Sequence, residues 1–466
     1  MLMGIKMRAY PTEEQKQVLS QWMGCARVVW NAKCEEWKYL STYARKYMPV
    51  DVYAPIDQGY SQYKEEALTP YLSKVPSQIL RNATSNWYET MGRWRRGICN
   101  PAKRKKKGST SSVHLTRELY QFGKEETGKC QLNIGTKKFP VGVLKFKSHR
   151  DFLVPKSLWI RKQAGIWWVS FCYEDGLDGA PLPSTQERLE FFRTLSSEEL
   201  ETRVIGIDRG VKVAAQTQDT SYDLGEKEKE KQRRREKYIA RFQKGLARQK
   251  KGSNRRDLTK SKISRLHLKN ANVRENFCHQ TSHALTKESG KLIVMEDLKT
   301  SMMTRRAKPK KDITGKWIKN GAAQKSGLNR SILSIGWHKL ETFTRYKANR
   351  RGSLLVKIAP HFSSQECADC SHIHPGNRVS QAEFACLACG NRDNADRNAA
   401  LVLKKRAINL VQHSGAELSE KGVLFLPDIG RGVSRKTSKP TARKQGQRNV
   451  KKDGNGYALP PEALAL

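Results

Sequence analysis

Four cysteines crowd into a short stretch near the C-terminal end of the chain, and they constrain the local fold more than any other feature. Cys367-Ala-Asp-Cys370 and Cys386-Leu-Ala-Cys389 are two Cys-x-x-Cys pairs separated by fifteen residues. Each pair can point two thiolates at one ion, and two pairs complete a closed tetrahedron. Because every ligand is sulfur and no position is left for water, we expect one structural Zn²⁺ ion. The alternative is four free or redox-active thiols.

The charge of the chain indicates the class of partner. Among 466 residues there are 88 Lys and Arg but only 45 Asp and Glu, which gives a formal net charge of +43. A compact protein with this surplus repels itself unless a polyanion neutralises it, so we expect nucleic acid as the partner. No stretch approaches 18 consecutive apolar residues, and the N-terminus lacks the apolar core of a secretory signal. We therefore expect a cytoplasmic, nucleoid-associated protein without a membrane partner.

The N-terminal part of the chain shows first a helical and then a strand period. Residues 4–10 alternate between apolar and basic, which predicts a strand, and Thr12 followed by Gln15 is typical of a helix capping box. Helical spacing continues to about residue 96. From about residue 113 the period shortens, and segments 158–161 and 166–173 predict a β-hairpin. A polar linker is expected around 176–184.

The C-terminal part alternates strands with helices, which indicates a second core of α/β type. We expect more than one core in any case, because single cores stop growing at roughly 250–300 residues. The predicted strands are 203–207, 211–216, 291–295 and 353–358. The predicted helices are 226–287, 331–348 and 396–410. Beyond about residue 430 the tail is basic and predicted to be disordered without a partner.

Three carboxylates stand at the ends of predicted elements. Asp208 follows one apolar strand, Glu296 ends another, and Asp396 opens the final helix. A charge at the end of a buried strand is costly unless it meets a metal ion or a partner. Each residue also has a plain alternative: a hairpin turn for Asp208, a turn cap for Glu296 and a helix N-cap for Asp396. Spacing alone does not show that the three converge.

The order of these motifs resembles the TnpB family, the RNA-guided DNA nucleases encoded by insertion sequences. The similar segments are Val-Ile-Gly-Ile-Asp208-Arg-Gly-Val, Leu-Ile-Val-Met-Glu296-Asp-Leu, and the cysteine pairs running into Asp396-Arg-Asn-Ala-Ala. A further similar segment near the N-terminus is Arg8-Ala-Tyr-Pro-Thr, and the resemblance as a whole covers about residues 4–405. The departures are small: Arg209 replaces the usual residue after the first Asp, and Asn394 stands where the family often has Asp.

The resemblance implies a multidomain α+β fold. It consists of a β-barrel-like wedge domain with an inserted helical recognition domain, followed by a RuvC/RNase H-like α/β nuclease domain with an inserted zinc ribbon. The implied boundaries in the N-terminal half are 1–11 for the first wedge strand, 12–112 for the recognition domain and 113–200 for the rest of the wedge. The nuclease domain is expected at 201–360, and it includes a basic helical insertion at 226–288 and a lid at 300–330. The zinc ribbon follows at 361–392, the last nuclease helix at 393–412 and the tail at 413–466.

The resemblance also assigns the chemistry. It implies that Asp208, Glu296 and Asp396 meet and hold two catalytic Mg²⁺ ions, which prefer hard oxygen ligands and can activate water. Asn398 and Asp393 lie near enough in sequence to support the three carboxylates, although Asp393 also fits a solvent-exposed position. Cys367, Cys370, Cys386 and Cys389 would hold the zinc ion.

Basic residues outside these motifs are candidates for nucleic-acid contact. Lys74 and Gln78 are one helical turn apart, so both could face a groove, and a Gln can pair with adenine. Lys103 and Lys105 belong to a basic run that we expect on phosphates. A further such run contains Arg233, Arg234 and Arg235. For each set, the alternative is an ordinary solvated surface.

Together these features predict a monomeric endonuclease that binds a transposon-derived guide RNA, recognises a short target-adjacent motif and cleaves double-stranded DNA. One alternative is a miniature type V CRISPR effector. Another is an RNA-guided DNA-binding repressor, which the intact set of three carboxylates argues against. A third is a transposase that acts without RNA through the same kind of metal site.

Overall fold

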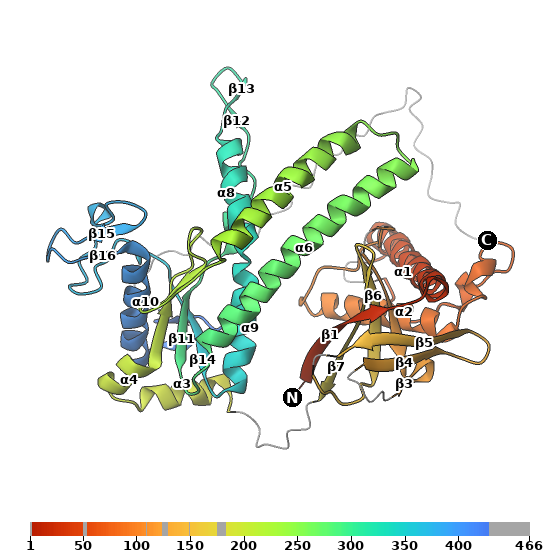
Figure 1. The fold of residues 1–466 in the computed structure, drawn as a ribbon, viewed down its shortest axis with the longest axis horizontal. Helices are drawn as coiled ribbons and strands as arrows, with labels where there is room; N and C mark the ends of the chain where they lie inside the picture. The colour runs from red at the N-terminus through yellow and green to blue at the C-terminus, as the bar shows by residue number, and fades with distance from the viewer. Residues whose placement is uncertain are drawn as a thin grey trace.

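The computed structural model describes residues 2–49, 54–108, 110–123, 129–148, 150–174 and 183–427. The expected basic tail beyond residue 430, and all but the last two residues of the expected linker, lie outside these ranges. The chain forms two parts, an N-terminal part with helices on an antiparallel sheet and a C-terminal part around a parallel sheet (Figure 1). None of the described helices is long and apolar enough to cross a membrane.

The N-terminal part contains an antiparallel sheet of seven strands. Its order is β2-β6-β7-β1-β5-β4-β3. The strands are β1 (Leu2–Tyr10), β2 (Thr110–Thr116), β3 (Tyr120–Gly123), β4 (Lys129–Gly135), β5 (Pro140–Lys147), β6 (Ser157–Gln163) and β7 (Ile166–Glu174), with the 3₁₀ turn η3 (Arg117–Leu119) between β2 and β3. The first strand lies between two strands from much later in the chain, β5 and β7. The predicted hairpin is confirmed by the pairing of β6 with β7.

Two helices and this sheet share a single hydrophobic core. Helix α1 (Glu13–Tyr47) begins at the predicted capping box, in which the Thr12 and Gln15 side chains each accept a hydrogen bond from the other's backbone N–H. It is followed by the 3₁₀ turns η1 (Ser61–Tyr63) and η2 (Pro70–Leu72) and by α2 (Ser77–Arg95). Trp22 of α1 and Leu80 of α2 are buried in one cluster with Leu144 of the sheet. Helices and strands therefore support each other here.

The C-terminal part is built on three parallel strands in the order β14-β11-β8. They are β8 (Val204–Ile207), β11 (Leu292–Glu296) and β14 (Leu354–Ile358). A short antiparallel pair, β9 (Ala215–Gln216) and β10 (Ser221–Tyr222), follows β8. The strand expected at 211–216 is thus only two residues long, because residues 211–214 form the bend that returns the chain and places Gln216 opposite Asp208.

Helices cover this sheet and extend its core. Helix α10 (Ala395–Gln412) packs against β8 and β11, α3 (Thr185–Arg193) packs against α10 and β14, and α4 (Ser197–Arg203) leads into β8. Leu189, Phe192 and Leu200 are buried in one cluster with residues of the parallel sheet. Residues 185–200 therefore pack with the C-terminal core, whereas the sequence assigned the whole of 113–200 to the wedge domain.

The basic helical stretch forms a long hairpin that projects from the C-terminal part (Figure 1). It consists of α5 (Glu226–Ala247) and α6 (Asn254–Leu285). The single helical segment expected at 226–287 is broken because the chain reverses near Gly252, whose φ of +85° suits glycine. Only Arg235 and Ile239 of α5 are buried, which leaves most of this helix exposed.

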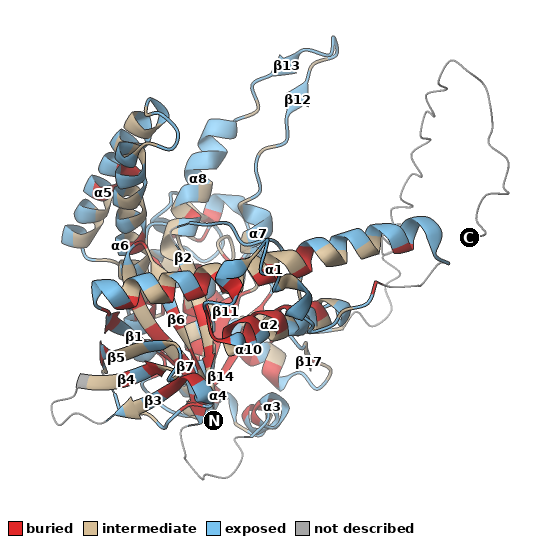
Figure 2. Cartoon of the chain, turned by 90° about the vertical axis from the view of Figure 1, so that its right-hand side faces the viewer, coloured by how far each residue is buried: buried red, intermediate tan, exposed pale blue. Residues whose placement is uncertain are grey.

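A second projection follows β11. It comprises α7 (Thr300–Met303), β12 (Lys310–Lys311), β13 (Trp317–Ile318) and α8 (Ala322–Ile335), and β12 and β13 form a narrow exposed arm (Figure 2). The helix expected at 331–348 is two helices, because Gly336, with a φ of +84°, separates α8 from α9 (Trp337–Arg350). Helix α9 packs against α6 and β14.

The remaining elements are short. They are the 3₁₀ turn η4 (Pro375–Asn377) and the pair β15 (Glu383–Ala385) and β16 (Arg392–Asn394), which precede α10, and the pair β17 (Glu417–Leu418) and β18 (Leu424–Phe425), which follows it.

The contact between β8 and α10 depends on a glycine. A Cβ atom placed on Gly206 would lie 2.0 Å from the carbonyl oxygen of Ala400 and 2.9 Å from the backbone nitrogen of Lys404. Both atoms belong to helix backbone and cannot move aside as a side-chain end could. Only glycine at position 206 therefore allows β8 and α10 to approach this closely.

We predict that Gly206→Ala lowers the melting temperature of the protein markedly. The added methyl group must push α10 from the sheet, and overpacking of this kind costs about 1–3 kcal/mol or more. Gly245→Ala on α5 is the matched control, since a Cβ there has no atom within 4 Å. Alanine favours helix over glycine by up to about 1 kcal/mol, so the control should be neutral or stabilising. Equal melting temperatures for Gly206→Ala and the wild-type protein would contradict this packing.

Candidate metal sites and nucleic-acid contacts

Two of the three predicted carboxylates leave the parallel sheet at the same edge. The register of β8 and β11 pairs Ile207 with Met295, so that the next residues, Asp208 and Glu296, follow side by side. The Asp208 main chain exchanges two hydrogen bonds of 2.9 Å with Gln216. The backbone of Asp208 therefore takes part in a hairpin, as the plain alternative supposed. This pairing uses main-chain atoms only and does not involve the Asp208 carboxylate. The Glu296 side chain is buried and accepts a 2.8 Å hydrogen bond from Ser363 Oγ.

The third carboxylate reaches this edge from α10. A Cβ on Gly210 would lie 3.8 Å from Asp396 Oδ2, which places this oxygen beside the loop that follows Asp208. The N-cap alternative for Asp396 is wrong, because Asn394 is the N-cap and its side chain accepts hydrogen bonds from the backbone nitrogens of Asp396 and Arg397. Asp396 therefore lies in the first turn with its carboxylate free to face the loop.

Electrostatics show that the three carboxylates interact. Burial and the nearby charges of Glu296 and Asp396 raise the pKa of Asp208 to about 7. Burial also raises the pKa of Glu296 and that of Asp396, although Ser363 and Arg378, respectively, oppose these increases. Negative charge is thus concentrated in a partly buried site without full compensation. Oxygen ligands in this electrostatic state suit a hard divalent cation.

Among the residues that the structure describes, the one closely grouped set of three or more His, Cys, Asp or Glu side chains is formed by the four cysteines, whose ligand atoms lie within 4.8 Å of one another. The three carboxylates share the sheet edge without forming so tight a group.

Arg378 is a site residue that the sequence did not indicate. One of its guanidinium nitrogens lies 3.6 Å from Asp396 Oδ1, and its side chain is partly exposed. The residue comes from the loop between the two cysteine pairs, seventeen positions before the last helix begins. No periodicity or spacing rule links it to a carboxylate on that helix, so only the fold reveals the pair.

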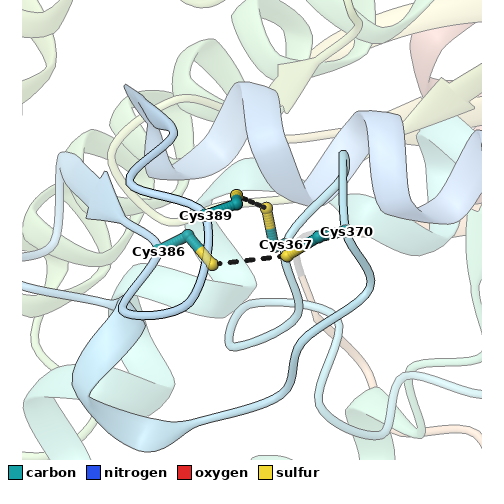
Figure 3. Close-up of side chains that lie close together, drawn as sticks. All are labelled: Cys367, Cys370, Cys386 and Cys389. Carbon is teal, nitrogen blue, oxygen red and sulfur yellow. Dashed lines mark hydrogen bonds between the residues drawn. The ribbon is translucent and has the colours of Figure 1, made fainter.

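The four cysteines come together as predicted (Figure 3). Their sulfur atoms all lie within 4.8 Å of one another, with 3.7 Å between Cys367 and Cys389 and 3.5 Å between Cys370 and Cys386. Each of these two distances joins a cysteine of the first Cys-x-x-Cys pair to a cysteine of the second. Four thiols around one point suit a tetrahedral zinc ion, and they disfavour independent free thiols.

The first cysteine pair is attached to the helix that carries Asp396. The buried Asn398 side chain donates to the carbonyl of Glu366 at 2.7 Å and accepts from the backbone nitrogen of Ala368 at 2.9 Å. Arg406, two turns further along α10, donates to the Glu366 carboxylate at 2.8 Å. Asn398 was expected to support the carboxylates, but it holds the cysteine loop instead.

Asp393 is half-buried and 3.2 Å from Arg397 Nη1. It was considered either as support for the three carboxylates or as a solvent-exposed residue. Its carboxylate accepts hydrogen bonds from Arg397 and from the backbone nitrogen of Asn394.

The helical argument for Lys74 and Gln78 is wrong. Helix α2 starts at Ser77 with Pro76 as its N-cap, so Lys74 lies in the preceding turn and the two side chains do not share a helix face. Lys74 is exposed and Gln78 half-buried. Their contact with DNA stays a prediction that now has no geometric support from helical spacing.

The basic run at Lys103 and Lys105 is held by α1. Trp30 donates from its indole nitrogen to the carbonyl of Lys103 at 2.9 Å. The Asn31 side chain bonds both the backbone nitrogen and the carbonyl of Lys105, at 2.7 and 3.0 Å. Lys103 is exposed, so it presents its charge from a fixed backbone. Lys105 is exposed as a residue, but its ammonium nitrogen lies 3.4 Å from the centre of the Trp30 ring, and burial lowers its pKa to about 8.

The three consecutive arginines of α5 are not equivalent. Arg233 and Arg234 are exposed and form only surface ion pairs, with Glu226 and Glu230. Arg235 is buried and bonds Glu228 of its own helix and Asn270 of α6. The prediction of nucleic-acid contact is therefore corrected for Arg235, because this side chain joins the two helices of the hairpin.

Three family models match parts of the chain. Residues 1–40 match the helix-turn-helix domain of the OrfB_IS605 group, although they form β1 and most of α1 here. Residues 183–307 match OrfB_IS605, described as a probable transposase, and this match begins just before α3. Residues 337–403 match the TNB domain of Cas12f1-like proteins, and they include all four cysteines and Asp396.

Known proteins resemble the chain over most of its length. It is 27% identical over 401 residues to the putative RNA-guided DNA endonuclease InsQ of Escherichia coli, covering 86% of this chain and 90% of that protein. It is 27% identical over 405 residues to a putative RNA-guided DNA endonuclease of Streptomyces pristinaespiralis, covering 85% and 87%. It is also 32% identical over 209 residues to the CRISPR-associated endodeoxyribonuclease Cas12f1 of Sulfoacidibacillus thermotolerans, covering 42% and 44%.

The raised pKa of Asp208 predicts a pH-dependent gain of stability in Asp208→Asn. The folded protein holds its proton up to about pH 7, while the unfolded chain loses it near 3.8. The folded state is therefore destabilised as pH rises from about 4 to 7, and asparagine removes this effect. Without divalent ions at pH 8, Asp208→Asn should melt at least about 2 °C higher than wild type, and near pH 4 the gain should vanish.

Asp219→Asn is the control, since Asp219 is an exposed carboxylate in the turn between β9 and β10. It should leave the melting temperature unchanged at both pH values. A wild-type protein that is as stable as Asp208→Asn at pH 8, or more stable, would contradict the charge repulsion at this site.

Proposed function

Because this chain belongs to the TnpB family, we propose that it is an RNA-guided DNA endonuclease that cleaves double-stranded DNA at its carboxylate site. The observation that carries this proposal is the convergence of Asp208, Glu296 and Asp396 from three elements on one sheet edge. The two relatives that align over most of the chain carry names of RNA-guided endonucleases, which does not favour a transposase that works without RNA.

The carboxylates would hold two Mg²⁺ ions. These ions, when bound, supply an activated water and stabilise the oxygen that leaves the cleaved phosphodiester. Asp208 interacts electrostatically with both Glu296 and Asp396, so all three carboxylates would contribute oxygen ligands. The Ser363 hydroxyl orients the Glu296 carboxylate, and the Arg378 guanidinium beside Asp396 can donate to a phosphate oxygen of the substrate. In the metal-free protein, burial and the charges of Glu296 and Asp396 raise the pKa of Asp208 to about 7, and bound dications would favour its deprotonated form.

One structural Zn²⁺ ion would bind Cys367, Cys370, Cys386 and Cys389. Through Asn398 and Arg406 this cluster is joined to α10, and Arg378 comes from the loop that it organises. Zinc would therefore support catalysis at a distance, by holding Asp396 and Arg378 near each other.

The basic surfaces would bind nucleic acid in the cytoplasm, near the nucleoid, with the protein as a monomer. We assign a transposon-derived guide RNA to the α5–α6 hairpin, with Arg233 and Arg234 on its phosphates, and we assign phosphate contacts to Lys103 and Lys105. Lys74 and Gln78 would lie near the target-adjacent motif. The domain roles of wedge, recognition lobe, nuclease core and lid remain part of this proposal, with the wedge ending before α3.

Glu296→Gln tests the assigned activity. This variant keeps a hydrogen-bonding partner for Ser363 but removes the negative charge, so guide-directed DNA cleavage should fall by at least about 100-fold, which is about 2.7 kcal/mol of barrier. Guide-dependent DNA binding should stay within about threefold, because backbone contacts and base pairing supply the affinity. Rates come from single-turnover cleavage of a plasmid that carries the target.

Glu288→Gln is the matched control for this experiment. Glu288 is an exposed carboxylate just before β11, at the opposite end of the strand from Glu296, and it pairs only with Lys291 at the surface. It should cleave at the wild-type rate, and both variants should contain one zinc ion per chain. Wild-type cleavage by Glu296→Gln would refute the assigned site.

Reversing the exposed arginines of α5 tests the RNA contact. In Arg233→Glu/Arg234→Glu, affinity for the guide RNA should fall, and the slope of log affinity against log salt should flatten by about 1.4–1.8 if both arginines neutralise phosphates. The charge-conserving Arg233→Lys/Arg234→Lys is the control and should keep the wild-type slope. Filter-binding titrations over a range of salt provide both values. An unchanged slope in the glutamate variant would place the RNA elsewhere.

A further inference from the structure

Arg209 is a buried charge directly after Asp208. Its side chain is 1% exposed, and burial lowers its pKa against the opposing effect of nearby acidic groups. Burying an arginine is costly, and a well-packed apolar residue is often cheaper. An arginine at this position therefore calls for a reason beyond filling space.

The contacts of Arg209 join the ends of two strands. One terminal nitrogen, Nη2, donates to the main-chain carbonyl of Glu296 at the end of β11. The other, Nη1, donates to the carboxylate of Glu341 on α9 at 3.5 Å. Because Arg209 itself follows β8, its guanidinium spans from β8 to β11 and fixes the backbone from which the Glu296 side chain projects.

Glu341 holds this guanidinium as part of a larger network. Its carboxylate also lies 3.2 Å from Arg345 of α9 and 3.6 Å from Lys357 of β14. Lys357 in turn lies 2.9 Å from Asp297, the residue after Glu296. The ends of all three parallel strands are thus connected behind the carboxylates, and Arg209 is the member that contacts the main chain of Glu296.

We propose that Arg209 is a positioning residue that fixes the Glu296 main chain against the end of β8, and thereby holds the carboxylates of Asp208 and Glu296 at the spacing that divalent ions require. This proposal rests on the proposed metal-dependent function. A lysine or an apolar side chain at this position does not replace it, since neither can donate to the Glu296 carbonyl and to Glu341 from one planar group.

The test separates positioning from simple charge balance. Arg209→Met leaves Glu341 with one partner fewer and should lower the melting temperature, whereas Arg209→Met/Glu341→Gln removes both charges and should recover most of that loss. Binding of Mn²⁺, measured by the loss of its free-ion electron paramagnetic resonance signal, should weaken at least about tenfold in both variants. The metal concentration for half-maximal cleavage should rise in parallel, while guide-dependent DNA binding stays unchanged.

Arg345→Met is the matched control, because Arg345 contacts the same Glu341 carboxylate but not the Glu296 main chain. It should keep wild-type Mn²⁺ affinity. If the double variant regains both stability and Mn²⁺ affinity, Arg209 serves only to balance Glu341 and the inference is overturned. If Asp208→Asn instead binds Mn²⁺ as tightly as the wild-type protein does, the proposed metal site itself is overturned.

Discussion

The close packing of Gly206 against Ala400 is the constraint on which the rest of the C-terminal part depends. It sets the height and rotation of α10 relative to β8, because a Cβ at position 206 would overlap the helix backbone. Asp208 lies two residues after the glycine, and Asp396 lies one helical turn before Ala400. The contact therefore brings together carboxylates that are 188 residues apart in the chain, without requiring any direct attraction between them.

The same helix links this site to the cysteine cluster. Asn398 and Arg406 bond residues on either side of Cys367, namely Glu366 and Ala368. Arg378 extends from the loop between the two cysteine pairs to Asp396. One element thus carries Asp396 of the carboxylate site, the attachment of the first cysteine pair and the surface that packs against the sheet. A shift of α10 at any one of these three places should displace the other two, because well-packed interiors transmit strain.

Charge is distributed in two opposite ways in this molecule. The chain carries a large positive surplus, and part of it is displayed on α5 and α6, where few side chains are buried. The carboxylate site is a small negative region within this field, and its charges repel one another. Nucleic acid would neutralise the positive surface, and divalent cations would neutralise the carboxylate site. The two proposed ligands therefore offset opposite charges of the free protein.

Local patterns predicted local structure well. The spacing of four cysteines was sufficient for the cluster, and Thr12 with Gln15 was sufficient for the start of α1, because both depend on residues close in sequence. The carboxylates needed the family resemblance, since periodicity carries no information about contacts between distant segments.

What the sequence did not reveal depends on tertiary contacts. Gly206, Arg378 and the actual partner of Asn398 are defined by segments that meet only in the fold. The bend at 211–214 and the break at Gly336 were hidden by apolar residues that continue the pattern of the neighbouring element. Arg235 looked like its two neighbours in a basic run, but it faces α6.

The most direct test of this account is the location of divalent ions in a crystal of the protein grown with Mn²⁺, identified by anomalous scattering. We expect manganese within about 2.3 Å of carboxylate oxygens of Asp208, Glu296 and Asp396. Manganese bound elsewhere on the protein, with none at these three carboxylates, would contradict the account.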